Sequence, residues 1–259
     1  MSSGKRQLIV TIDGDGCWNP DWMRAVQTVI KRHPDLKFTA SLITAYYEGL
    51  MRKNSVEVNR RLARNLFEFD NVEPASHTFS HPNDWKNEQG RNLLNKPWSA
   101  REEVHRSINL LKELTNKPLE TLLLTGNCRP HAGHVKVMYD AGLIPFNGGL
   151  AHAGPYRMIG DYKVYNQRGR PDVNYTGIRK WTAEDGGSVP FLEKPDGYRE
   201  AVEWFATVPD WPVHIYFHFY AGEFKASIEA VDYVLNWAEN SDLQSMYLSE
   251  YIGLVNARA

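Results

Sequence analysis

The chain has 259 residues, of which 42% are hydrophobic and 24% are charged, and its net charge is −1. This length fits one large α/β domain or two small ones, and the balanced charge excludes a molecule drawn as a whole to nucleic acid or to an anionic membrane. No apolar run approaches the roughly 20 residues that cross a bilayer.

The start of the chain, MSSGKRQLIVTIDGDG, does not read as a secretion signal, because Asp13 interrupts its apolar run. We therefore expect either a cytoplasmic protein or a domain of a longer chain. Two cysteines, Cys17 and Cys128, build no disulfide framework. We expect two free thiols, with a disulfide between them as the alternative.

Strand-like and helix-like segments alternate through the first part of the chain. Residues 7–13, QLIVTID, form an apolar and β-branched run. Asn19 and Pro20 then mark a helix start, because asparagine is a good N-cap and proline suits the first helical position. Residues 36–43 are predicted as the second strand, 58–69 as a helix with an apolar stripe, and 72–77 as the third strand.

The alternation continues after residue 99. Ser99 and Glu102 form a capping box before a helix that extends to Leu114. The remaining predicted elements are a buried strand at 121–125, a helix at 135–141, a strand at 213–220 and a helix at 224–235. Nine of the 19 glycines fall between residues 147 and 197, a stretch without a helical period. We expect loops and short strands there that shape a groove, within a single domain covering 1–259.

Repeated strand–helix units imply a parallel sheet or a barrel. In such architectures the site gathers at the carboxyl ends of the strands. Asp13, His77, Thr125 and His218 all stand at or just beyond such ends, so they are expected to converge in space.

Asp13 and Asp15 are separated by a single glycine, and Gly16 follows them. Two carboxylates this close do not both stay ionised in an apolar pocket without a compensating cation, which a metal ion supplies. An acidic turn with glycines for backbone geometry is the alternative.

His77 and His81 lie four residues apart in EPASHTFSHP. Two imidazoles and one carboxylate make a ligand set that suits zinc or a similar divalent metal and leaves positions open for water and substrate. A pair of exposed histidines is the alternative, but the complete His, His, Asp set favours a metal site.

The segment NCRPHAGH and the strand VHIYFHFY supply further polar candidates. Arg129 can pair with a carboxylate and fix its pKa, or it is a surface arginine at a helix start. His131 and His134 are interpreted as residues of a helix face or rim. Strand alternation puts His214 and His218 on one face, with His218 nearest the site as a general acid and His214 packed inside the barrel.

In their order, these motifs resemble the NodB-type polysaccharide deacetylases, carbohydrate esterase family 4. That family's first motif is Thr-Phe-Asp-Asp-Gly, whereas this chain inserts Gly14 between the aspartates. Further segments resemble the deacetylase domain of PelA-type proteins, which act on Pel, a partly deacetylated exopolysaccharide of biofilms rich in N-acetylgalactosamine: SHTFSHP (76–82), TGNCRP (125–130), PFNGG (145–149), YKVYNQ…NYTG (162–177) and IYFHFYAGEFKASIEAVDYVLNWA (215–238).

The resemblance implies an α/β fold, a distorted (β/α) barrel with fewer than eight units, and a divalent metal, zinc with cobalt or nickel as alternatives. It assigns metal binding to Asp15, His77 and His81. Asp13 becomes the general base, although the inserted glycine leaves the reverse assignment of the two aspartates open. Arg129 orients the base and His218 is the acid. The family's Asp and Trp motif that supports the histidine has no clean counterpart here.

The predicted activity is removal of acetyl groups from N-acetylhexosamine units of an exopolysaccharide, with release of acetate. A backbone N–H near Cys17 or Tyr47 is expected to hold the oxyanion. The alternatives are a catalytically dead carbohydrate-binding domain on the same fold and an O-acetyl esterase. The expected partners are the polysaccharide and flanking domains or export machinery of a longer chain, which would act in the periplasm or outside the cell. The candidates for stacking on sugar rings, with core packing as the alternative for each, are Trp18, Tyr46, Trp85 and Tyr220.

Overall fold

The computed structural model describes residues 5–49, 56–82, 99–124, 130–152, 156–168, 173–176, 179–182, 188–190, 202–203, 212–217 and 224–257. A nine-stranded sheet, mostly parallel, has the order β11-β1-β2-β3-β4-β5-β7-β6, and β12 pairs with β1 outside this path. Its strands are β1 (Arg6–Ile12), β2 (Phe38–Leu42), β3 (Val72–Ser76), β4 (Thr121–Leu123), β5 (Ile144–His152), β6 (Tyr156–Ile159), β7 (Tyr162–Arg168), β11 (Val213–Phe217) and β12 (Leu243–Met246).

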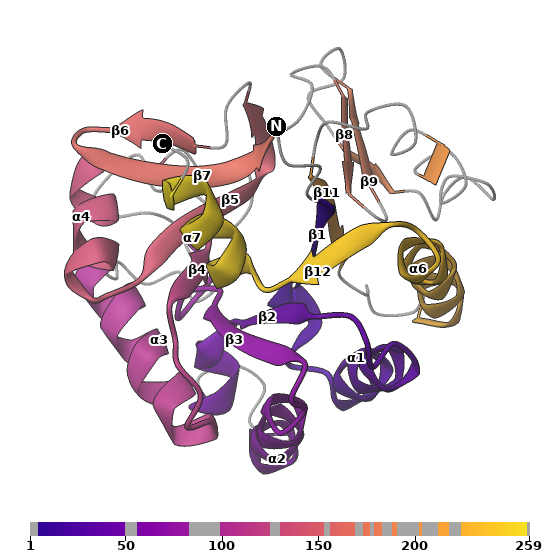
Figure 1. The fold of residues 1–259 in the computed structure, drawn as a ribbon. Coiled ribbons are helices and arrows are strands. Elements are labelled where there is room, and N and C mark those ends of the chain that lie inside the picture. Colours follow the sequence, from indigo (N-terminus) through magenta and orange to yellow (C-terminus); the bar gives the residue numbers. More distant parts are fainter. Residues whose placement is uncertain are drawn as a thin grey trace.

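The helices cover the outside of this curved sheet, which makes the fold a distorted (β/α) barrel (Figure 1). They are α1 (Pro20–Arg32), α2 (Val56–Phe67), α3 (Ala100–Leu114), α4 (Ala132–Asp140) and α6 (Phe224–Glu239). A second, three-stranded sheet consists of β8 (Val173–Thr176), β9 (Arg179–Thr182) and β10 (Ser188–Pro190). The predicted α/β barrel is thereby confirmed.

Strand alternation divides the core into an outer and an inner layer. Leu8, Val10 and Ile12 of β1 belong to the cluster that packs against α1, α2 and α6. Ile9, between them, belongs to a separate inner cluster with Ala75 of β3. Because successive side chains of a strand point to opposite faces, the odd-numbered residues of β1 line the barrel interior.

The helix α7 (Leu248–Ala257) fills one end of the barrel interior. In Figure 1 it lies within the ring of strands, inside the outer helices. Leu248, Tyr251 and Ile252 are each at most 4% exposed and pack with Ile9 and other inward residues of the strands. Neither α7 nor β12 was expected from the sequence.

The structure confirms the helix starts that the sequence predicted from capping residues. The side chain of Asn19 accepts a hydrogen bond from the N–H of Asp21, with Pro20 as the first helical residue. Ser99 and Glu102 form the predicted capping box of α3. The second helix ends at Phe67, so the prediction that it reaches Phe69 was wrong.

Between residues 147 and 197, the described segments are strands, with β5 and β7 paired in the main sheet. This stretch therefore contributes more to the barrel than the expected short strands and loops. No helix among the described residues is long and apolar enough to cross a membrane.

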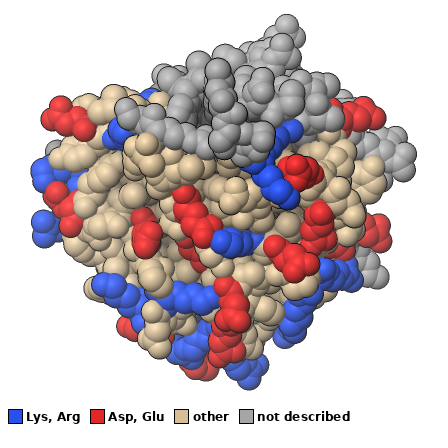
Figure 2. Space-filling model, viewed as in Figure 1, with Lys and Arg blue, Asp and Glu red and all other residues tan. Residues whose placement is uncertain are grey.

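Acidic and basic side chains are mixed over the face seen in Figure 2, and neither sign forms a continuous patch there. This distribution agrees with the net charge of −1. Such a face provides no single-signed field to attract a polyanion.

Candidate functional site

Asp13 stands directly after β1, at the carboxyl end of the parallel strands. Its backbone is still extended, with φ −80° and ψ 125°. It therefore continues the inward row of Ile9 and Thr11. The short 3-10 helix η1 (Gly14–Gly16) follows, and the Asp13 side chain makes no capping hydrogen bond to it. The carboxyl group is thus presented toward the barrel axis, at the edge where the site was expected.

Glycines are required on both sides of Asp15 because the backbone packs closely there. A Cβ added at Gly14 would lie 2.3 Å from the carbonyl oxygen of Ser41 in β2. One added at Gly16 would lie 2.1 Å from Cδ1 of the buried Trp22. The inserted Gly14 therefore lets this turn rest directly on β2. Of Asp15 itself the structure describes the backbone, within η1, and not the side chain.

His77 and His81 are brought together just beyond β3. Their ring centroids are 5.2 Å apart, and the ring planes are inclined by 58°. His77 is 2% exposed, while His81 is partly exposed. The pair is thus an inner and an outer imidazole at one edge of the barrel, close enough together for both to reach one ion.

The tautomer of His77 also fits a metal ligand. Its Nδ1 lies 3.1 Å from the carbonyl oxygen of Leu123. A carbonyl can only accept, so the proton is on Nδ1 and the Nε2 atom carries the lone pair. Histidines that bind metals commonly donate their other N–H in this way, which fixes the ring orientation. Among the described side chains no cluster of three possible ligands occurs, and the third predicted ligand, Asp15, is not one of those side chains.

The backbone between the two histidines is strained. Thr78 has φ 68° and His81 has φ 53°, both in the left-handed region. A β-branched residue rarely adopts this conformation, which costs about 1–3 kcal/mol. Such strain persists only where surrounding contacts impose it, and it is common at functional sites.

His214 of β11 lies deeper in the barrel and is 1% exposed. Its Nε2 is 2.8 Å from the hydroxyl of Thr11, and its ring stacks edge-on against Phe146 with centroids 5.3 Å apart. Burial lowers the pKa of His214 to about 3. The prediction that His214 is a packed barrel histidine is confirmed.

The other predicted site residues lie either outside the described residues or in the core. Arg129, His218, Trp85 and Tyr220 lie outside the described residues. Tyr46 is 6% exposed within the outer core, which favours the core-packing alternative. Trp18 packs partly buried against the same core.

The segment after β4 also bears on the predicted roles. His131 caps α4 by accepting a hydrogen bond from the N–H of Gly133, and His134 is 5% exposed. His131 precedes α4 and His134 lies on its buried face, which agrees with their interpretation as residues of a helix face or rim. The N–H of Cys17 itself donates to the carbonyl oxygen of Gly14 at 3.0 Å. The oxyanion donor expected near Cys17 or Tyr47 stays a prediction. Cys17 is a buried thiol, and its pairing with Cys128, which lies outside the described residues, stays untested.

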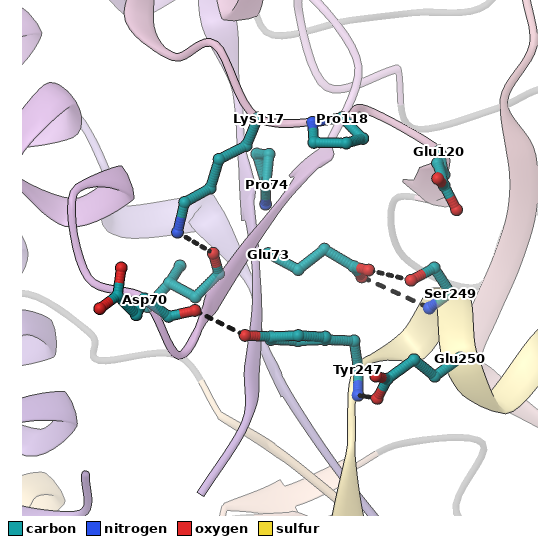
Figure 3. A pocket seen from close by; sticks show the side chains of 10 residues that line it. Asp70, Glu73, Pro74, Lys117, Pro118, Glu120, Tyr247, Ser249 and Glu250 are labelled. Carbon is teal, nitrogen blue, oxygen red and sulfur yellow. Dashed lines mark hydrogen bonds between the residues drawn. The ribbon is translucent and has the colours of Figure 1, made fainter.

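A cavity of about 480 Å³ lies at the opposite end of the barrel. Val72 begins β3 and Glu120 precedes β4, so this cavity opens at the amino ends of the strands (Figure 3). There Glu73 accepts hydrogen bonds from Ser249, and the Tyr247 hydroxyl donates to the carbonyl of Asp70. Because sites of parallel α/β folds lie at the carboxyl ends, and because these bonds attach α7 to the barrel, we interpret this cavity as structural.

Solved structures share this fold. A protein from Mycobacterium smegmatis that is described as a polysaccharide deacetylase aligns with a TM-score of 0.61 and 12% identity, over 100% of this chain and 93% of that one. The peptidoglycan N-acetylglucosamine deacetylase Bc1960 aligns with a TM-score of 0.60 and 13% identity, over 95% and 88%. A pseudoenzyme of the CE4 family from Bacillus anthracis aligns with a TM-score of 0.57 and 14% identity, over 95% and 65%.

These likenesses establish the fold. The chain spans about two thirds of the length of the pseudoenzyme. No family model matches the sequence, and no curated protein matches it. The fold is therefore that of the NodB-like deacetylases, and it is shared by active enzymes and by a pseudoenzyme, so activity depends on the residues at the site.

Proposed function

We propose that this chain is a metal-dependent N-deacetylase acting on N-acetylhexosamine units of an exopolysaccharide. The observation that carries the proposal is the pair His77 and His81, with centroids 5.2 Å apart and His77 oriented through the Leu123 carbonyl. Asp13 extends the inward row of β1 at the same edge of the barrel. The deacetylases that share the fold support the choice of reaction.

His77, His81 and Asp15 would hold the metal ion, with zinc as the first choice and cobalt or nickel as alternatives. A divalent ion supplies Lewis-acid chemistry when bound, polarising an acyl oxygen. The inner position of His77 and the partly exposed position of His81 leave the outer side of the pair accessible to a sugar substrate.

In this proposal, side chains of the protein accept and donate the protons of the reaction. Asp13 takes a proton from the attacking water as the new C–O bond forms at the acetamide carbon. Arg129 holds the Asp13 carboxylate ionised and oriented. His218 gives a proton to the nitrogen as the C–N bond breaks, which releases acetate and the free amine.

The motifs shared with PelA-type domains narrow the proposed substrate to a Pel-like polymer rich in N-acetylgalactosamine. We further propose that the domain acts in the periplasm or outside the cell, as part of a longer chain. Flanking domains or export machinery would then deliver the polymer to the site.

A second candidate is a carbohydrate-binding domain without catalysis, which the likeness to the Bacillus anthracis pseudoenzyme favours. The predicted base, acid and ligand positions are all occupied by suitable residue types in this chain, which favours an active enzyme. An O-acetyl esterase would use the same groups on an ester, a substrate with a better leaving group.

The test pairs metal analysis with acetate release from N-acetylgalactosamine, N-acetylglucosamine and O-acetylated oligomers. His77→Ala should lose most bound metal and nearly all activity while keeping its secondary structure. His105→Ala, which removes an exposed histidine of α3, is the matched control and should retain both. Chelation should inactivate the wild type, and zinc or cobalt should restore it.

The outcomes separate the candidates. Acetate release from N-acetylated oligomers alone supports the deacetylase, and release from O-acetylated oligomers alone supports the esterase. Oligosaccharide binding without acetate release supports the binding domain. Full metal occupancy in His77→Ala would contradict the ligand assignment.

A further inference from the structure

The loop that joins His77 to His81 departs sharply from regular backbone. Thr78 and His81 are the non-glycine residues with positive φ among those described. The two left-handed residues are three positions apart, and with this backbone the His81 ring lies 5.2 Å from the His77 ring. The relative position of the two imidazoles therefore depends on this backbone conformation.

Hydrogen bonds within the segment, and one from a neighbouring segment, hold the loop. The N–H of Thr78 donates to Ser76 Oγ at 3.0 Å, and the N–H of His81 donates to Thr78 Oγ1 at 3.1 Å. The carbonyl oxygen of Phe79 accepts from the N–H of Ala45 at 2.8 Å. These bonds fix the ends and one side of the loop.

The middle of the loop is held by the carboxylate of Glu103, a residue of α3 that is 2% exposed. Its Oε2 accepts from the N–H of Phe79 at 3.1 Å and from the N–H of Ser80 at 2.8 Å. Its Oε1 accepts from the hydroxyl of Ser80. All three donors come from the two residues that lie between the left-handed positions.

The helix that carries Glu103 does not need it as a cap. The capping box of α3 is made by Ser99 and Glu102, the residue next to Glu103. A buried carboxylate is costly unless it is fully hydrogen-bonded. The hydrogen bonds that Glu103 accepts from Phe79 and Ser80 hold the loop and not the helix.

We propose that Glu103 is a positioning residue, which imposes the strained conformation of residues 78–81 and so aims His81 at the same point as His77. This inference rests on the proposed function for the metal, but the orientation of His81 can be measured without it. Partners that orient metal ligands typically change metal affinity by about 10- to 100-fold when they are removed.

The experiment compares Glu103→Ala with Glu102→Ala, which removes the helix cap from the same turn but leaves the loop contacts. Zinc affinity is measured by calorimetry on the metal-free protein, and the imidazole signals of His81 and His105 are followed by NMR without metal. Glu103→Ala should weaken zinc binding by about 10- to 100-fold and shift the His81 signals, with His105 unchanged. Glu102→Ala should lower stability and leave zinc affinity and His81 as in the wild type.

Conservative variants keep the test decisive if Glu103→Ala does not fold. Glu103→Gln retains one oxygen for the two N–H groups and should restore most of the affinity. Glu103→Asp is too short to reach them and should resemble the alanine variant. Normal zinc affinity and an unshifted His81 in Glu103→Ala, or in Glu103→Asp, would overturn the proposal. If the wild type binds no zinc but the imidazole signals of His81 still shift in these variants, the proposed metal binding is refuted and the positioning role of Glu103 is supported.

Discussion

His214 offers a quantitative test of the barrel interior, because its burial makes stability depend on pH. Burial lowers its pKa from the ordinary 6.5 to about 3 in the folded protein. Between these values the unfolded chain binds a proton at this residue and the folded chain does not. The contribution to stability is therefore complete above pH 6.5 and falls as the pH drops toward 3.

The expected loss follows from 1.36 kcal/mol for each pKa unit. One unit below the unfolded pKa, at pH 5.5, the folded state should lose about 1.4 kcal/mol relative to pH 7.5, and at pH 4.5 about 2.7 kcal/mol. For a domain of ordinary stability, about 5–15 kcal/mol, this is a large share.

The measurement is urea unfolding of the wild type and of His214→Gln at each pH. Glutamine removes the titrating group and can still hydrogen-bond the Thr11 hydroxyl, so the difference between the two proteins cancels the other titrating residues. That difference should change in favour of the variant by about 2.7 kcal/mol between pH 7.5 and 4.5. Parallel stability curves over this range would refute a buried, neutral His214.

Three further predictions concern the turn, the acid and the far end of the barrel. Gly14→Ala should lower the free energy of unfolding by about 1–3 kcal/mol and weaken zinc binding, because its Cβ would lie 2.3 Å from the Ser41 carbonyl oxygen. Gly253→Ala, with open space around it, is the control. Equal effects of the two substitutions would contradict the close approach at Gly14. His218→Ala should slow deacetylation of an N-acetyl sugar by roughly 10²–10⁴-fold and affect an aryl acetate much less; equal losses would indicate a positioning role. Burial raises the pKa of Glu73, so the folded state binds this proton more tightly than the unfolded chain does. Glu73→Gln should therefore gain stability relative to the wild type as the pH rises above 4.5. A stability difference that stays constant from about pH 4 to 8 would contradict the raised pKa.

The outer layers of this fold could be predicted because their signals are local. Asn19 before Pro20, and Ser99 before Glu102, mark helix starts within a few residues, and apolar runs such as residues 7–12 mark buried strands. The rule for parallel strands predicted that Asp13 and His77 stand at the same edge of the sheet, and each does directly follow a parallel strand. No contact between distant segments had to be known for these predictions.

What the sequence did not predict depends on contacts between distant segments. The apolar side of α7 is ordinary for a terminal helix, and its role inside the barrel is defined by Ile9, Ala75 and Phe146 from three separate strands. The left-handed conformation of Thr78 runs against its β-branched side chain. No propensity predicts it, because the cause lies in α3.

Two hydrogen-bonded glutamates, the partly buried Glu73 and the buried Glu103, show how the ends of the barrel differ. Glu73 accepts hydrogen bonds from Thr39 and from the N–H and hydroxyl of Ser249, so it attaches the start of α7 to β2 and β3. This carboxylate therefore helps to close the amino end of the barrel.

Glu103 also accepts hydrogen bonds, from Phe79 and Ser80 in the short loop between His77 and His81. That loop closes no core and carries two strained residues. Local rules of sequence are most often broken where a protein needs a particular geometry for function. A buried charge used to maintain backbone strain between two imidazoles is therefore an argument, independent of any likeness in fold, that the carboxyl end of the barrel is the functional end.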